Sequence, residues 1–287
     1  MTEPSLADHV AERDRWARSA RGPLALVTTQ LVEQPQPVWP VPGRWAPAPG
    51  GLTVTAEAAD GIVVDGVPVD GAVLVAGDQA VVPSTVAFAD GTAATVHGHT
   101  LRVWDPASDA VTRFATIARF DASPSHVTSG RFRATSGQED RGSVVDAAGD
   151  PLVVAGTVST EIDGVPLELL AVRSAVHHGV ARLQLIVQDA TSALPEDDPG
   201  SSYSMGRFLY LDDPGADAPS ADDSSADDSG ADDSGAEVLL DWDRLVLPPC
   251  AFSYQFACPI PPEQNRIPVP LRAGERHPVD ATGTVLH

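Results

Sequence analysis

Residues 60–78, DGIVVDGVPVDGAVLVAGD, decide the fold class of this chain. Short runs of β-branched residues alternate there with Asp-Gly pairs. Asp-Gly favours tight two-residue hairpins, because both central residues of a type I′ turn need a positive φ. The same pattern continues outward over residues 52–114 without a fixed repeat period. We therefore predict an antiparallel meander or small sandwich here, in which the aspartates form turns and do not bind ligands.

A second β-rich region occupies residues 142–247. Its strand-like runs are separated by turn signals at Gly149-Asp150 and Asp163-Gly164. Leucine and valine alternate with glutamine in residues 183–188, which favours a strand with one buried face. We expect this region to form a second β-sandwich or a partly open β-barrel. The predicted fold class is therefore all-β.

The N-terminal residues add one short helix to this scheme. Apolar residues recur at roughly helical spacing over residues 5–19, with Ser5 and Asp8 available as caps. We predict this helix in residues 1–22, a first β unit in residues 23–120, and a C-terminal β unit in residues 121–287.

A proline-rich connector, QPQPVWPVPGRWAPAPGG, lies early in the first β unit. Proline cannot donate to a strand ladder, so the sequence favours extended or polyproline-like backbone and argues against a central strand. Trp39 and Trp45 are expected to pack this connector onto the core.

The charge balance excludes several classes of partner. All 18 cationic residues are arginine, a usage typical of a GC-rich bacterial genome, and 40 acidic residues give a net charge of −22. Nucleic acids and anionic membranes need a basic face, so neither is an expected partner. Residues 1–27 lack the apolar core of a signal peptide, and no apolar run approaches the length of a membrane helix. The cytoplasm is the expected compartment, where cysteines are expected to be reduced.

An acidic insertion spans residues 213–237, and within it Ala-Asp-Asp-Ser recurs at positions 221, 226 and 231. With almost no apolar side chain, it cannot offset its ordering entropy and is predicted to be disordered. Its acids do not follow the spacing of an EF-hand. Cys250 and Cys258 lack two further zinc ligands nearby, and His177 and His178 are distant in sequence. We predict no metal and no cofactor.

The C-terminal third carries the most specific pattern in the chain. The segments QDATS (188–192), YSMGRFL (203–209), LDWDRLVLPPCAFSYQFACPIPPEQNRIPV (240–269) and AGE (273–275) resemble a bacterial and archaeal family called domain of unknown function 1684. The N-terminal WARSARGPLALV also resembles the start of that family. The residues that match the family pattern are Asp189, Thr191, Tyr203, Gly206, Arg207, Asp241, Arg244, Pro248, Pro249, Cys250, Phe252, Cys258, Pro259, Pro261, Pro262, Asn265, Gly274 and Glu275.

This chain departs from the family pattern at a few positions. Trp242 and Asp243 stand where Phe and Asn are usual, Leu247 replaces an Asn, and the acidic repeat is an insertion. The family has no assigned activity, so the resemblance implies an organisation and no chemistry.

The resemblance places Tyr203 and Arg207 near Asp189 and the Pro-Pro-Cys turn. Together with Asp241, these side chains would form a polar cluster able to orient an anionic or hydroxylated ligand. The alternative is a buried Arg-Asp pair that serves only the fold. The predicted ligand-binding residues are Asp189, Tyr203, Arg207, Asp241, Cys250 and Asn265.

Three functions remain open from the sequence. The first is a non-catalytic protein that binds a small molecule or an anion beneath the Pro-Pro-Cys loop. The second is a hydrolase-like enzyme in which Cys250 or Tyr203 acts with Asp189 or Asp241 as its partner. The third is a protein-interaction module that uses the acidic insertion and the connector. The oligomeric state does not follow from the sequence.

Overall fold

The computed structural model describes residues 5–135, 144–174, 182–214 and 235–286. The acidic repeats at 221, 226 and 231 lie outside the described residues, as do His177 and His178. The chain forms two compact units. The half-barrel unit consists of residues 1–9, 117–251 and 257–279, and the sandwich unit of residues 10–116, 252–256 and 280–287. Both units are discontinuous, whereas the predicted parts 1–22, 23–120 and 121–287 are continuous segments.

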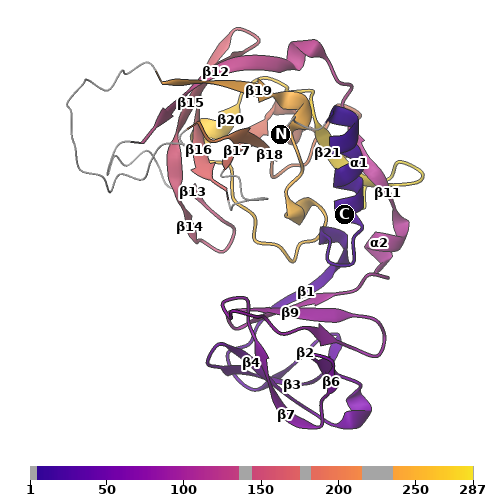
Figure 1. Cartoon of the computed structure of the whole chain (residues 1–287). Coiled ribbons are helices and arrows are strands. Elements are labelled where there is room, and N and C mark those ends of the chain that lie inside the picture. The colour runs from indigo at the N-terminus through magenta and orange to yellow at the C-terminus, as the bar shows by residue number, and fades with distance from the viewer. Residues whose placement is uncertain (1–4, 136–143, 175–181, 215–234, 287) are drawn as a thin grey trace, which may run out of the picture. The chain divides into compact units, whose positions relative to one another are not determined.

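The sandwich unit contains two antiparallel sheets that enclose one apolar core (Figure 1). Its four-stranded sheet has the order β2 (Gln36–Val38), β3 (Val41–Ala48), β4 (Gly51–Ala56) and β7 (Gly71–Ala76). Its six-stranded sheet has the order β1 (Leu26–Leu31), β10 (Thr100–Trp104), β9 (Ala93–His97), β8 (Val86–Ala87), β5 (Val63–Val64) and β6 (Val67–Pro68). Fully buried Trp45, Leu52 and Leu101 lie in the core between them.

Two of the Asp-Gly pairs form the predicted type I′ hairpins. Asp65 and Gly66 have φ values of 52° and 79° and join β5 to β6. Asp163 and Gly164 have φ values of 51° and 76° and join two strands of the half-barrel. Asp60-Gly61 instead closes a short 3-10 helix, η2 (Ala58–Asp60), with Gly61 in the left-handed region.

The prediction that prolines exclude a central strand from the connector is wrong. Strand β3 pairs with β2 on one side and β4 on the other. Pro42 lies in the part of β3 that faces only β2, and Pro47 in the part that faces only β4. Each proline therefore has one unpaired side where its missing N–H costs no ladder bond. Trp45 is buried as predicted, but Trp39 is 73% exposed and does not pack on the core.

The predicted N-terminal helix is confirmed as α1 (Leu6–Ala17). The Ser5 hydroxyl accepts a hydrogen bond from the Asp8 amide and donates one to its carboxylate, as predicted for the cap. A second helix, α2 (Asp109–Arg113), is one short turn capped by Ser108. Among the described residues, no helix is long and apolar enough to cross a membrane.

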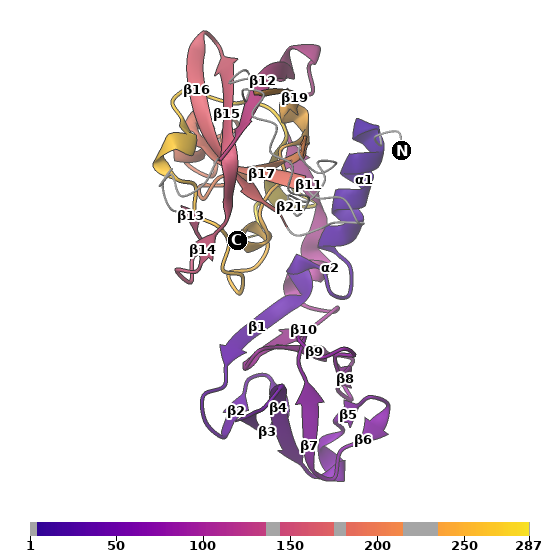
Figure 2. The same ribbon diagram turned by 60° about the vertical axis from the view of Figure 1, so that its left-hand side comes forward.

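The half-barrel unit is built on a strongly curved antiparallel sheet, in which β15 and β16 form a long hairpin (Figure 2). The strand order is β18 (Arg207–Asp212), β17 (Arg182–Asp189), β16 (Val165–Arg173), β15 (Val154–Ile162), β12 (Val127–Ala134) and β19 (Ala236–Asp241). Beyond β19 the chain returns to β18, where Val246 and Phe208 exchange backbone hydrogen bonds of 2.8 and 2.9 Å. Buried side chains, including Val158, Leu185 and Trp242, fill the interior.

Short strands and 3-10 turns complete the chain. Strand β20 (Arg266–Ile267) pairs in parallel with β17, β11 (Phe114–Arg119) pairs with β21 (Glu275–Asp280), and β13 (Val144–Val145) pairs with β14 (Pro151–Leu152). The 3-10 turns are η1 (Pro23–Ala25), η3 (Pro124–His126), η4 (Ala190–Ala193), η5 (Trp242–Arg244), η6 (Pro249–Ala251) and η7 (Glu263–Asn265). The predicted all-β class with a short N-terminal helix is confirmed.

Candidate functional site

Asp189 and Arg207 come together as the resemblance implies. Asp189 ends β17, Arg207 begins β18, and both side chains are fully buried. The Arg207 Nη2 lies 2.6 Å from the Asp189 Oδ2. The other carboxylate oxygen accepts hydrogen bonds from the amide and hydroxyl of Thr191 and from the Leu271 amide. The carboxylate is therefore fully used within the fold.

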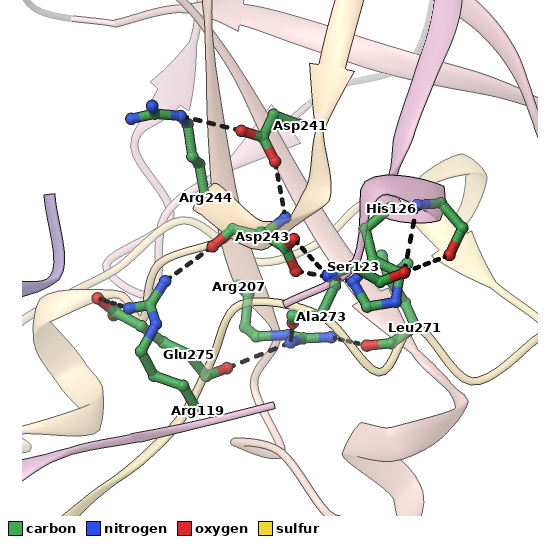
Figure 3. Close-up of polar contacts among 11 residues, drawn as sticks. Arg119, Ser123, His126, Arg207, Asp241, Asp243, Arg244, Leu271, Ala273 and Glu275 are labelled. Atoms are coloured by element: carbon green, nitrogen blue, oxygen red, sulfur yellow. Dashed lines mark hydrogen bonds and ion pairs between the residues drawn. The ribbon is translucent and has the colours of Figure 1, made fainter. Parts of the chain in front are cut away.

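The Arg207 guanidinium is equally committed to the polypeptide. It donates to the backbone carbonyls of Leu271, Ala273 and Glu275 (Figure 3). Burial lowers its pKa, and the negative charge of Asp189 opposes that shift. Only Nε lacks a partner among the described residues. Arg207 thus fastens the C-terminal segment to β17 and β18, and its guanidinium does not face a ligand.

A second polar network surrounds Glu275 and Asp243 (Figure 3). Fully buried Glu275 accepts from Arg119 at 3.1 Å and from the Leu247 amide at 2.6 Å. Arg119 also donates to the backbone carbonyl of Asp243. The Asp243 carboxylate holds His126 Nδ1 at 2.7 Å through one oxygen and the Ser123 amide through the other.

Asp241 and Asn265 also serve local structure. Asp241 caps η5 by accepting from the Asp243 amide, and it pairs with Arg244 at 3.0 Å. Asn265 is buried, and its side-chain amide bonds to the N–H and C=O of Leu170 and to the C=O of Ile186. It bridges β16 and β17 beyond their paired residues, as another strand would.

Cys250 and Cys258 form a different kind of site. Both are free thiols; Cys258 is buried and Cys250 is half-buried. The Cys250 backbone amide donates to the Cys258 sulfur at 3.2 Å. A hydrogen bond from the Cys258 thiol, aided by one from Tyr203, lowers the pKa of Cys250 against the opposing effect of burial. The same contact with Cys250, together with burial, raises the pKa of Cys258.

The six predicted residues therefore separate into groups. Asp189 and Arg207 form one buried pair, and Tyr203 meets Cys250 at the thiols. Asp241 and Asn265 belong to two further, separate contacts. A shallow depression on β12, β15 and β19, lined partly by Arg131 and Glu237, contains none of the six.

The sequence reasoning missed the contacts of Arg119, His126 and Asp243. In the sequence Asp243 stands out only as a departure from the family pattern, and His126 carries no motif. His126 and Asp243 are 117 positions apart in the chain, so no sequence spacing could reveal that they form a pair. Within the described ranges, no group of three His, Cys, Asp or Glu side chains is arranged to hold a metal ion.

Residues 112–276 match the family described as "Protein of unknown function (DUF1684)". The chain belongs to this family. An uncharacterised protein of Haloarcula marismortui, solved by solution NMR, is similar with 26% identity and a TM-score of 0.40. That similarity covers 57% of this chain and 77% of the archaeal one. No curated protein matches the chain.

Proposed function

We propose that this DUF1684 member is a dithiol redox protein, in which Cys250 is the nucleophile and Cys258 the resolving thiol. The observation that carries the proposal is the 3.2 Å hydrogen bond from the Cys250 amide to the Cys258 sulfur, which holds the two cysteines together, with Tyr203 beside the Cys250 thiol. Asp189, Arg207, Asp241 and Asn265 are used in structural bonds, whereas Cys250 and Tyr203 meet at the thiols. We prefer this redox chemistry to the hydrolase hypothesis, because the two proposed acid partners, Asp189 and Asp241, are paired with Arg207 and Arg244.

The site supplies the two properties that thiol–disulfide exchange requires. The Cys250 thiolate is stabilised by hydrogen bonds from Cys258 and Tyr203, which increases the fraction of nucleophile at neutral pH. Cys258 has a raised pKa, so it keeps its proton and can donate a hydrogen bond to the Cys250 thiolate. The asymmetry assigns the first attack to Cys250.

The reaction consumes a disulfide substrate. The Cys250 thiolate attacks one sulfur of the substrate, the substrate S–S bond breaks, and the first substrate thiolate leaves as a mixed disulfide forms between Cys250 and the other half of the substrate. Cys258 then loses its proton to solvent and attacks the Cys250 sulfur, which releases the second substrate thiolate. One substrate disulfide is reduced to two thiols, and the protein gains one disulfide.

A chromogenic aromatic disulfide tests this order of events. The wild-type protein should release two equivalents of coloured thiol per chain and retain no adduct by intact mass. Cys258→Ser should release one equivalent and keep a stable adduct on Cys250, and Cys250→Ser should react slowly. Equal reactivity of the two single variants, or adducts on both cysteines of the wild type, would contradict the proposal.

A further inference from the structure

Arg102 carries a buried polar atom without a partner. It lies on β10, and its Nε has no hydrogen bond with any described residue. Other arginines in the described ranges pair with carboxylates: Arg113, Arg119, Arg173, Arg182, Arg207 and Arg244. With a net charge of −22, the chain has ample acids to pair Arg102 as well. A buried N–H without a hydrogen-bond partner costs free energy, so the Arg102 Nε needs an explanation.

A second polar group without a protein partner lies opposite Arg102. Thr29 on β1 is its register partner in the antiparallel ladder. The Arg102 Nε and the Thr29 Oγ1 are both buried atoms without a hydrogen-bond partner among the described residues. Directly opposite residues in a ladder have Cβ atoms about 5 Å apart, so both donors can reach the two oxygens of one oxyanion.

Segment 252–256 encloses this part of the sandwich unit. The Gln255 side-chain carbonyl accepts the Thr29 amide at 2.7 Å, and the Phe256 ring lies 6.0 Å from the Arg102 guanidinium carbon. Trp104 packs edge-on against Phe256 and donates to Thr95. The Phe256 ring shields the Arg102 guanidinium from water, and charge-assisted hydrogen bonds are stronger where water is excluded.

We propose that Arg102 and Thr29 bind an oxyanion, either inorganic phosphate or a small carboxylate, on the outer face of β1 and β10. The site belongs to the sandwich unit and lies outside the family match at residues 112–276. Arg102 supplies the positive charge and the Nε–H donor, and Thr29 supplies its hydroxyl. The anion would accept hydrogen bonds from the Arg102 Nε–H and the Thr29 hydroxyl, the two groups that the described residues leave without partners.

Arginine Nε–H NMR spectra of the full-length protein test the site directly. Titration with inorganic phosphate, and in a second series with benzoate, should give a saturable shift of the Arg102 Nε–H resonance. A response to phosphate alone would assign phosphate chemistry, and a response to benzoate alone would assign a carboxylate held against the aromatic rings. Failure of both to give a saturable shift would overturn the proposal.

Variants separate binding from folding. Arg102→Gln should remove the saturable response of the neighbouring Thr29 amide, and Thr29→Val should weaken binding about tenfold through loss of one hydrogen bond to a charged group. Arg102→Lys keeps the charge but lacks the Nε–H, so it should bind weakly even if Arg102→Gln is unstable. Arg44→Gln changes an exposed arginine on β3 of the same unit, is the matched control and should bind normally. Normal binding by folded Arg102→Gln would contradict the assignment.

Discussion

Asn265 shows how one side chain can replace a strand's backbone groups. Its amide satisfies the Leu170 N–H and the carbonyls of Leu170 and Ile186, all within the buried half-barrel. Asn265→Leu would leave these groups unpaired, and we expect a loss of about 3 kcal/mol or more in the free energy of unfolding. Urea unfolding measures the loss. Gln264→Ala changes the exposed neighbouring residue and should cost less than about 0.5 kcal/mol; equal losses for the two variants would contradict this role.

The sequence predicted part of the site at this scale. The proximity of Asp189 to Arg207 followed from the resemblance, as did that of Tyr203 to the Pro-Pro-Cys turn. It did not show that Arg207 would bond to three backbone carbonyls, because a guanidinium has five donors and the sequence does not tell which oxygens reach them. The difference between a ligand site and a structural clamp depended on those bonds.

Among the secondary-structure elements, the turn at Gly274 sets the approach of β21 to the chain that follows η5. Gly274 has a φ of +71°, and a Cβ atom there would lie 2.5 Å from the Leu245 Cβ and 2.6 Å from the Leu245 oxygen. Gly274→Ala should therefore lower the free energy of unfolding by about 3 kcal/mol, from positive φ and backbone clash together.

Gly283→Ala provides the control for this prediction. Gly283 has a φ of +84°, but no atom lies within 4 Å of its added Cβ. Gly283→Ala should lower the free energy of unfolding by only about 1 kcal/mol, which is the cost of placing alanine at a positive φ. If thermal or urea unfolding gave the same loss for both variants, the close approach at Gly274 would not matter for stability.

Element types were more predictable than element environments. The Asp-Gly pairs at 65 and 163 indicated hairpins correctly, because type I′ geometry depends on two adjacent residues only. Alternation in β17 predicted one buried face, yet Gln184 and Ile186 are buried as well. Asn265 bonds to the Ile186 carbonyl and β20 pairs with the end of β17, and both are long-range contacts that local alternation cannot reveal.

For the whole molecule, buried His277 predicts how stability depends on pH. Burial, with a smaller contribution from the positive charge of Arg276, lowers the pKa of His277 from 6.5 to about 4. The unfolded chain therefore binds a proton below pH 6.5, while the folded chain stays neutral at His277 until about pH 4. Stability contributed by neutral His277 is complete above pH 6.5 and is lost as pH falls toward 4.

The loss between pH 7 and pH 5 should be about 2 kcal/mol in the free energy of unfolding, since one pKa unit corresponds to about 1.4 kcal/mol. Urea unfolding at each pH gives the profile. His277→Gln removes the titrating group and should flatten the profile over this interval. An unaltered profile in His277→Gln would assign the pH dependence to other groups.

The unit organisation was the part of the fold least accessible from sequence. The two β-rich regions were visible as two sets of turn signals, but segment 252–256 belongs to the sandwich unit although its neighbours on both sides belong to the half-barrel unit. Ser253 bonds to the Leu26 carbonyl across 227 positions in sequence, and no local pattern encodes such a separation. Cys250 and Cys258 lie on either side of this segment, and both belong to the half-barrel unit.

The most direct measurement is intact-mass analysis with peptide mapping after equilibration in glutathione buffers of graded redox potential. The dithiol account predicts a single transition in which wild-type protein loses two hydrogens and forms only the Cys250–Cys258 disulfide, without retained glutathione. Cys258→Ser should instead carry one glutathione on Cys250 in oxidising buffers. A wild-type protein that keeps both thiols in oxidising buffers, or that accumulates glutathione on either cysteine, would contradict the account.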